Sequence, residues 1–174
     1  MATTLHLAEI PSNQNVMTNS SVQLRAFAPG SAGDAEAFRT LNEWWIRKYF
    51  GIEQHDTEIL SDPEGYVLAQ GGHIFFAVAD GVRVGCCALI PISPGIFEVA
   101  KMAVSEGWQG GGIGRKVLAY TVEQGRLLGA RALYLETNDT LANAIHLYES
   151  LGFRHLPPKP SPYVRANVFM ELRF

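Results

Sequence analysis

A run of glycines between two apolar segments is the feature of this sequence whose residue types could do chemistry. It reads Trp108-Gln109-Gly110-Gly111-Gly112-Ile113-Gly114-Arg115. Glycines lack a Cβ, so several backbone N–H groups can approach one ligand closely. A helix beginning here would add unpaired N–H donors and the positive end of its dipole, and Arg115 would add a formal charge. The turn therefore predicts a phosphate or pyrophosphate site, the alternative being a loop in which the glycines only turn the chain.

Two other glycine-rich phosphate motifs do not fit this turn. A Walker loop needs Lys and then Ser or Thr after its last glycine, but Ile113 follows Gly112. A dinucleotide-binding fingerprint needs a third glycine where Arg115 stands after Gly110 and Gly112. The sequence also lacks the early strand–helix–strand unit of a dinucleotide-binding domain. Both classes are therefore excluded.

Hydrophobic periodicity and turn residues predict the elements that position this turn. Strands are expected at 22–27, 73–79, 82–92, 96–104, 132–137 and 168–174, and helices at 34–50, 56–60, 112–128 and 141–151. Asp34 should cap the first helix, and Asp80-Gly81 should form a type I′ turn because both positions tolerate positive φ. Hairpins precede a strand–helix–strand–helix unit. We therefore expect an α/β (α+β) fold with helices on both faces of a mixed, mostly antiparallel sheet of about six to seven strands.

Two segments in this order resemble the GNAT superfamily of N-acetyltransferases. Gln109-x-x-Gly112-x-Gly114, after the strand end Lys101-Met102-Ala103-Val104, is similar to the family motif Gln/Arg-x-x-Gly-x-Gly/Ala. Leu135-Glu136-Thr137-Asn138, followed by a segment ending in Leu147-Tyr148-x-x-x-Gly152-Phe153, is similar to the family strand and helix that end in Leu-Tyr-x-x-x-Gly-Phe. The resemblance implies a single GNAT-like acyl-CoA N-acyltransferase domain over residues 22–174. Residues 1–21 are expected to form a weakly ordered leader.

The resemblance implies acetyl-CoA as the co-substrate that donates the acetyl group. Family members hold its pantetheine arm between two splayed central strands. By position, backbone groups of Met102, Ala103 and Val104 would contact this arm, and Asn138 would lie within its reach. The pyrophosphate would be held by the turn, at Gln109, Gly110, Gly111, Gly112, Ile113, Gly114 and Arg115. Leu141 departs from the pattern, because many members carry Asn seven residues before the tyrosine.

Transfer to an amine needs a proton acceptor, because a free alkyl amine with a pKa near 10 is mostly protonated at neutral pH. Glu98 matches the family's fourth-strand glutamate by position, and burial would raise its pKa; a water chain or a structural carboxylate are the alternatives. On a regular strand Glu98 shares a face with Ala100 and Met102, and Lys101 should form a structural ion pair. Tyr148 matches the family's general acid, the alternative being a tyrosine packed in the core. Further candidate proton carriers are His73, His146 and His155.

The first helices carry aromatic and acidic residues that would favour a cationic acceptor by charge and cation–π contact. These are Trp44, Trp45, Tyr49 and Phe50, with Glu43, Glu53, Asp56 and Glu58. The aromatic rings could equally pack on the sheet, and the acidic residues could form a solvated face. The leading interpretation is direct transfer of acetyl from acetyl-CoA to a primary amine of a small molecule or peptide in a ternary complex. A non-catalytic acyl-CoA sensor and a transferase for longer acyl chains are the alternatives.

Composition bounds the compartment and the partners. The 174 residues include 14 Lys and Arg against 17 Asp and Glu, a net charge of −3, which argues against nucleic-acid binding. No apolar run approaches the ~20 residues that span a bilayer, and residues 1–21 lack a signal-peptide pattern. The two cysteines, Cys86 and Cys87, are adjacent and should point to opposite faces of a strand as free thiols. We therefore expect a cytoplasmic monomer or homodimer without membrane contact or bound metal.

Overall fold

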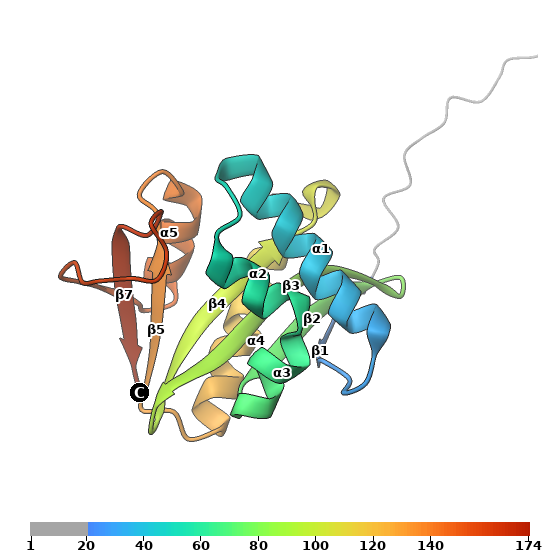
Figure 1. Ribbon diagram of the computed structural model, residues 1–174, viewed down its shortest axis with the longest axis horizontal. Coiled ribbons are helices and arrows are strands. Elements are labelled where there is room, and N and C mark those ends of the chain that lie inside the picture. The colour runs from blue at the N-terminus through green and yellow to red at the C-terminus, as the bar shows by residue number, and fades with distance from the viewer. Residues whose placement is uncertain (1–20) are drawn as a thin grey trace, which may run out of the picture.

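Seven strands form one sheet in the computed structural model, which describes residues 21–174 (Figure 1). The strands are β1 (Gln23–Ala26), β2 (His73–Ala79), β3 (Val82–Ser93), β4 (Ile96–Val104), β5 (Ala132–Thr137), β6 (Arg154–Leu156) and β7 (Val168–Arg173). Their order is β1-β2-β3-β4-β5-β7-β6, and β4 and β5 are the parallel pair among antiparallel neighbours. The predicted mixed, mostly antiparallel sheet is therefore confirmed. Almost all of the predicted leader lies outside the described residues.

Helices cover both faces of this sheet. They are α1 (Ala32–Tyr49), α2 (Gln54–Ser61), α3 (Pro63–Tyr66), α4 (Ile113–Leu127) and α5 (Ala142–Ser150), with single 3-10 turns at Leu68–Gln70 and Glu106–Trp108. Figure 1 shows α1, α2 and α3 in front of β2, β3 and β4, with α4 behind them. Each face has its own hydrophobic cluster, and α5 packs with α4. Cys86 lies in the cluster under α1 and α2, whereas Cys87 lies in the opposite one, so the two free thiols do point to opposite faces.

Asp34 does not cap α1, contrary to the sequence prediction. Ser31 is the N-cap, and its side chain accepts a hydrogen bond from the backbone N–H of Asp34. The Asp34 carboxylate is buried and binds the guanidinium groups of Arg25 at 2.7 and 2.8 Å and of Arg83 at 2.8 Å. The hydrogen bonds from Arg25 hold the pKa of Asp34 well below its usual range. Asp34 therefore ties α1 to β1 and β3.

The two central parallel strands separate soon after they meet. Backbone pairing joins Ile96, Phe97 and Glu98 of β4 to Ala132, Leu133 and Tyr134 of β5, and it ends there. Beyond this point the rest of β4 and the rest of β5 diverge. Their facing backbone groups are then free to bind another molecule instead of each other.

A β-bulge shifts the faces of β4 in the separated part. Ala100 lies opposite Ala88, and Ala103 lies opposite Cys86, so two residues of β4 face one of β3. The backbone of Lys101 adopts a positive φ of 52°, which is unfavourable for a residue other than glycine. After the bulge, Met102 packs with the cluster on the α4 side. The expectation that Glu98 and Met102 share a face is therefore wrong, because it assumed unbroken alternation.

No helix within residues 21–174 is long and apolar enough to cross a membrane.

Candidate active site

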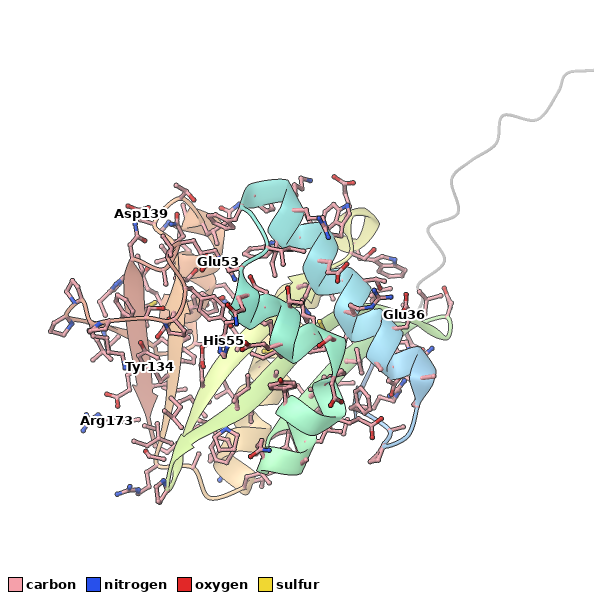
Figure 2. All side chains as sticks on the ribbon, viewed as in Figure 1. Glu36, Glu53, His55, Tyr134, Asp139 and Arg173 are labelled. Carbon is pink, nitrogen blue, oxygen red and sulfur yellow. The ribbon has the colours of Figure 1, made fainter. Side chains whose placement is uncertain are left out.

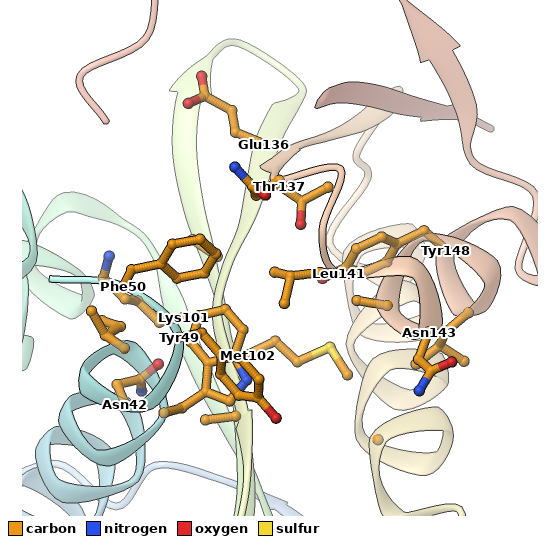
Figure 3. Close-up of a pocket in the computed structure, with 18 of the residues that line it drawn as sticks. Asn42, Tyr49, Phe50, Lys101, Met102, Glu136, Thr137, Leu141, Asn143 and Tyr148 are labelled. Carbon is orange, nitrogen blue, oxygen red and sulfur yellow. The ribbon is translucent and has the colours of Figure 1, made fainter. Parts of the chain in front are cut away.

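A cavity of about 510 Å³ opens where β4 and β5 separate. Figure 3 shows Tyr49 and Phe50 of the α1 end on one side, Tyr148 of α5 on the other, and Met102 between them. Most of the predicted site residues line this cavity, namely Glu98, Met102, Ala103, Val104, Gln109, Gly110, Gly114, Asn138 and Tyr148. Four do not: Gly111, Gly112, Ile113 and Arg115. The cavity thus joins the two sequence segments that lie about thirty residues apart along the chain.

The glycine-rich turn leads into the N-terminus of α4, as predicted. Gly112 is the N-cap with a φ of 81°, and the first intrahelical hydrogen bond runs from the Lys116 N–H to the Gly112 carbonyl. The N–H groups of Ile113, Gly114 and Arg115 precede that bond, so the helix itself leaves them unpaired. Gln109 ties the turn to β4, because its Nε2 donates to the Val104 carbonyl at 3.0 Å. This arrangement fits an anion at the cavity end of α4.

The side chains of the turn are used differently from its backbone. Ile113 is buried in the core, and the Arg115 guanidinium donates to Ser150 Oγ at 2.7 Å, so it is held against the end of α5. Gly114 allows a close approach, because an added Cβ would lie 3.3 Å from Met102 Cε and 3.7 Å from Leu147 Cδ2. Glycine at this position therefore permits α4 to pack closely against β4 and α5.

Glu98 stands at the point where the strands part. Its Cα pairs with that of Tyr134 in the last rung of the ladder, and its side chain lines the cavity. Burial and, to a lesser extent, the charge of Glu136 raise the pKa of Glu98 to about 7, against the opposing charges of Lys101 and Lys159. A carboxylate with a pKa near neutrality can both accept and release a proton under ordinary conditions.

Tyr148 lies across the cavity on α5. Its ring packs edge-on against Phe153 with centroids 6.0 Å apart, so it is part of the core and of the cavity wall at once. Burial raises the pKa of the Tyr148 phenol above its ordinary value. The phenol therefore keeps its proton at neutral pH and has one to donate.

Glu136 is a cavity-lining carboxylate that the sequence analysis did not single out. It accepts hydrogen bonds from the Tyr134 hydroxyl at 2.9 Å and from the Ser161 hydroxyl. The period-two rule would have found it, since Tyr134 and Glu136 share a face of β5 with Glu98 beside them. Glu136, which two hydroxyl groups hold in place, and Glu98 beside it therefore face the same end of the cavity.

Lys101 forms an ion pair as expected, but its partner belongs to α2. Its Nζ donates to Asp56 Oδ1 at 2.8 Å and to the Tyr163 hydroxyl at 2.6 Å. Arg165 binds the same carboxylate at 2.7 and 2.8 Å and contacts Glu53 at 3.1 Å. Figure 2 labels Glu53 at the start of α2. This cluster fastens the loop between β6 and β7 to the start of α2.

The sequence analysis named the wrong acidic residues near α1 and α2 as those that would attract a cationic acceptor. None of Glu43, Glu53, Asp56 and Glu58 lines the cavity. Glu53 and Asp56 form a capping box and pair with Arg165, and Glu58 accepts from Gln54. Trp45, Tyr49 and Phe50 do line the cavity, whereas Trp44 lies outside it beneath Lys48. The carboxylates available to an acceptor are therefore Glu98 and Glu136.

The side chain of Asn138 is used within its own loop. Its Nδ2 donates to the Arg165 carbonyl at 2.7 Å, and its Oδ1 accepts from the Thr140 backbone N–H at 2.9 Å. Of the other candidates, His73, His146 and His155 lie away from the cavity lining. Within residues 21–174 there is also no group of three His, Cys, Asp or Glu side chains that could hold a metal ion.

Comparison with known proteins identifies the family. The model of the Acetyltransferase (GNAT) family matches residues 38–153. The chain belongs to this family. An IAA acetyltransferase of Azospirillum brasilense is 40% identical over 105 residues, which cover 56% of this chain and 67% of that protein. The uncharacterized N-acetyltransferase YjgM of Escherichia coli is 36% identical over 94 residues, which cover 52% of this chain and 56% of that protein, so the chain spans little more than half of this relative.

Solved GNAT structures share the fold. A GNAT acetyltransferase of Staphylococcus aureus Mu50 has a TM-score of 0.76 and 21% identity, over 88% of this chain and 99% of that one. The acetyltransferase yncA of Salmonella typhimurium, solved with acetyl-CoA, has a TM-score of 0.71 and 20% identity, over 88% of this chain and 94% of that one. The predicted family, α/β fold and acetyltransferase class are therefore confirmed.

Proposed function

We propose that this protein transfers the acetyl group of acetyl-CoA to a primary amine by direct attack within a ternary complex. The observation that carries the proposal is Glu98, a carboxylate with a pKa of about 7 that lines the cavity where β4 and β5 part. A group of this kind suits the one step that aminolysis of a thioester cannot avoid, the removal of a proton from the ammonium form of the acceptor.

Acetyl-CoA fits the two ends of the cavity. The Salmonella neighbour is solved with acetyl-CoA, and the same fold here supplies a parted pair of strands. The backbone of Met102, Ala103 and Val104 would face the pantetheine arm. The unpaired N–H groups at the start of α4 would bind the pyrophosphate, and Gly112 keeps that approach open because no protein atom lies within 4 Å of a Cβ placed there. Acetyl-CoA supplies the activated carbonyl carbon.

The proton path uses two residues on opposite sides of the cavity. Glu98 takes the amine proton, directly or through a water molecule, as the amine attacks the carbonyl carbon. Tyr148 gives its proton to the departing thiolate, because burial keeps its phenol neutral. Both groups line the same cavity, so one substrate complex can reach both.

A covalent acyl-enzyme does not suit this site. The thiols of Cys86 and Cys87 are fully buried and do not line the cavity. Burial also raises the pKa of Cys87 to about 12, which leaves almost no thiolate at neutral pH. Direct transfer needs neither of them.

The acceptor end is shaped for a cationic amine next to aromatic rings. Glu98 and Glu136 supply negative charge, and Tyr49, Phe50 and Tyr163 supply ring surface. The names of the relatives span different acceptors: besides the Azospirillum IAA acetyltransferase, the human N-acetylaspartate synthetase is 35% identical over 117 residues, 64% of this chain and 37% of that protein. The acceptor here is a primary amine of a small molecule or a peptide.

A panel of primary amines tests the proposal. Polyamines, amino acids, aminoglycosides and peptides are each incubated with the protein and acetyl-CoA, and both free CoA and acetylated amine are measured. We expect at least one amine to be acetylated, and we expect Glu98→Gln to abolish most of that product. Tight binding of acetyl-CoA with no acetylated amine in any assay would contradict the proposal and favour an acyl-CoA sensor.

A further inference from the structure

A proline-rich loop presents a lysine beside Tyr134, whose hydroxyl binds the cavity carboxylate Glu136. The segment after β6 reads Pro157-Pro158-Lys159-Pro160-Ser161-Pro162. Each proline fixes its own φ, so the loop has few conformations open to it. Its far end is anchored at the cavity, because Ser161 donates to Glu136 and also accepts from the Tyr163 N–H at 3.0 Å. Lys159 therefore occupies a defined place although its residue is exposed.

The Lys159 ammonium lies over the face of Tyr134, with Nζ 3.6 Å from the ring centroid. Figure 2 labels Tyr134 on β5. Tyr134 is the strand partner of Glu98, and its hydroxyl donates to Glu136 at 2.9 Å. The positive charge of Lys159 also acts on Glu98, whose pKa it lowers. The chain thus places a primary amine of its own against Tyr134, the residue that connects to both carboxylates a cationic acceptor would use.

The other lysines differ from Lys159 in ways that matter for reaction. The Lys101 residue is 9% exposed, and its ammonium donates to Asp56 and Tyr163. Burial lowers the pKa of Lys101, against the opposing charge of Asp56. Lys48 pairs with Glu106 and lies against Trp44, outside the cavity. Lys116 is exposed on α4. Lys159 does not line the cavity either, but it is exposed and lies over Tyr134, the strand partner of Glu98.

We propose that Lys159 is a self-acetylation site, modified in cis by the acetyltransferase centre of its own chain. The inference rests on the proposed function. The Lys159 ammonium gives one proton to Glu98, and the neutral Nζ then attacks the carbonyl carbon of acetyl-CoA. A C–N bond forms, the C–S bond breaks, and the departing thiolate takes a proton from Tyr148. The second proton of the nitrogen restores the Tyr148 phenol, and the proton on Glu98 passes to solvent. The products are Nε-acetyl-Lys159 and CoA, and no further reactant is needed.

Acetylation of Lys159 would change the acceptor end. The acetylated side chain has no charge, so the cation over Tyr134 that offsets Glu98 and Glu136 is lost. An incoming cationic amine would then meet two carboxylates without a resident competitor. Self-acetylation should therefore lower the KM for a cationic amine and shift the acidic limb of the pH–rate profile to higher pH.

Mass spectrometry of the full chain tests the assignment. The protein is incubated with acetyl-CoA and no added amine, and the intact mass is followed before peptide mapping. We expect a gain of one acetyl group on Lys159, absent in Lys159→Arg, which keeps the charge, and present in the matched variant Lys48→Arg. The rate per molecule should not depend on protein concentration, and Glu98→Gln should slow it by about 10²–10⁴-fold.

Parallel assays on the amine panel separate the two proposals. Acetylated amines together with an unmodified Lys159 would overturn the self-acetylation site and leave the proposed function standing. Acetylation of Lys159 at the same rate in Glu98→Gln would show uncatalysed chemical labelling and would also overturn the site. A rate that rises with protein concentration would overturn reaction in cis. Failure to acetylate both Lys159 and every amine would overturn both proposals.

Discussion

Glu98 of β4 and Tyr134 of β5 form the last pair of the parallel ladder, and the two strands part immediately beyond them. Glu98 of this pair lines the cavity that opens beyond it. The position of this pair also explains the raised pKa of Glu98. The paired part of the sheet buries the carboxyl group, while the separated part leaves it open to a ligand. The fold thus creates a proton acceptor and the entry to it at the same position.

Replacing Glu98 with Gln should lower turnover by about 10²–10⁴-fold if this residue is the base. The affinity for acetyl-CoA should hardly change, since the substitution keeps the shape of the side chain. Steady-state kinetics and calorimetry measure the two effects. The matched control is Glu123→Gln on α4, whose carboxylate pairs only with Arg126 on the exposed surface and should leave turnover unchanged. Full turnover in Glu98→Gln would remove the base role.

The pH dependence follows from the same residue. Burial raises the pKa of Glu98 from its ordinary value to about 7, and a base must be deprotonated to act. Activity should therefore rise with pH through a midpoint near 7. The acidic limb should disappear in Glu98→Gln, measured with the same amine so that the titration of the amine is common to both. A limb that stays in place in the variant belongs to another group.

Replacing Tyr148 with Phe should reduce turnover by about 10²-fold or more, while binding of acetyl-CoA stays within a few-fold. The ring contact with Phe153 remains, so the protein should fold. The loss should shrink with an acyl donor whose leaving thiol is more acidic, because that thiolate needs less help. Rates measured over a series of acyl donors test this. An equal loss for every donor would indicate positioning, and unchanged turnover would reject the acid role.

Replacing Gly112 with Val should weaken acetyl-CoA binding, because a side chain would stand where the pyrophosphate approaches the start of α4. Loss of one hydrogen bond to a charged group is worth about 1.5–3 kcal/mol, or roughly 10–150-fold in affinity. Gly30→Val is the matched control, since Gly30 also has a positive φ, 78° against 81°, and open space around its Cβ. Both variants should lose similar stability. Calorimetry showing equal acetyl-CoA affinity in the two would contradict the pyrophosphate site.

The Asp56 cluster should dominate the acid sensitivity of the fold near the cavity. Burial raises the pKa of Asp56, but the hydrogen bond from Arg165 and the charge of Lys101 outweigh it and bring the pKa down to about 2. A depressed carboxyl pKa gives stability that is present above the ordinary value near 4 and is lost as pH falls from about 4 toward 2. Urea unfolding over this range should show the loss in the wild type and little of it in Asp56→Ala.

At neutral pH, Asp56→Ala should destabilise the protein by about 3–5 kcal/mol, because it leaves Lys101 as a buried cation. Adding Lys101→Met should recover part of that loss. The control Glu36→Ala breaks an exposed pair with Arg39 and should cost less than about 1 kcal/mol. A double variant no more stable than the single one would mean that the charge on Lys101 is not the cause.

Strand and turn positions were largely readable from the sequence. The strands at 73–79, 96–104 and 132–137 have the predicted bounds, and Asp80 and Gly81 both take positive φ as the hairpin turn requires. β6 was missed because three residues show no alternation. The helix α3 was also missed, although Pro63 occupies its first turn, where a missing N–H costs nothing.

The candidate site was predictable where local motifs carry it and not where distant residues meet. Glu98, Tyr148 and the glycine turn do line or adjoin one cavity. The β-bulge at Lys101 could not be predicted from the sequence, because lysine does not favour the positive φ that it takes there. The acidic residues of α2 looked free because their partner, Arg165, lies more than a hundred residues away in the chain.

A single-turnover experiment tests the central claim most directly. Acetyl-CoA labelled in its acetyl group is bound to excess Lys159→Arg protein, which has no Lys159 to acetylate, and is mixed with an amine from the panel. Acetylated amine and free CoA are measured over time. Direct transfer past Glu98 predicts that labelled amine and CoA appear together at one rate, and that Glu98→Gln slows both equally. CoA that appears before the labelled amine, with acetyl held on a cysteine, would contradict direct transfer. Acetyl-CoA that remains bound and intact with every amine would contradict the enzyme itself.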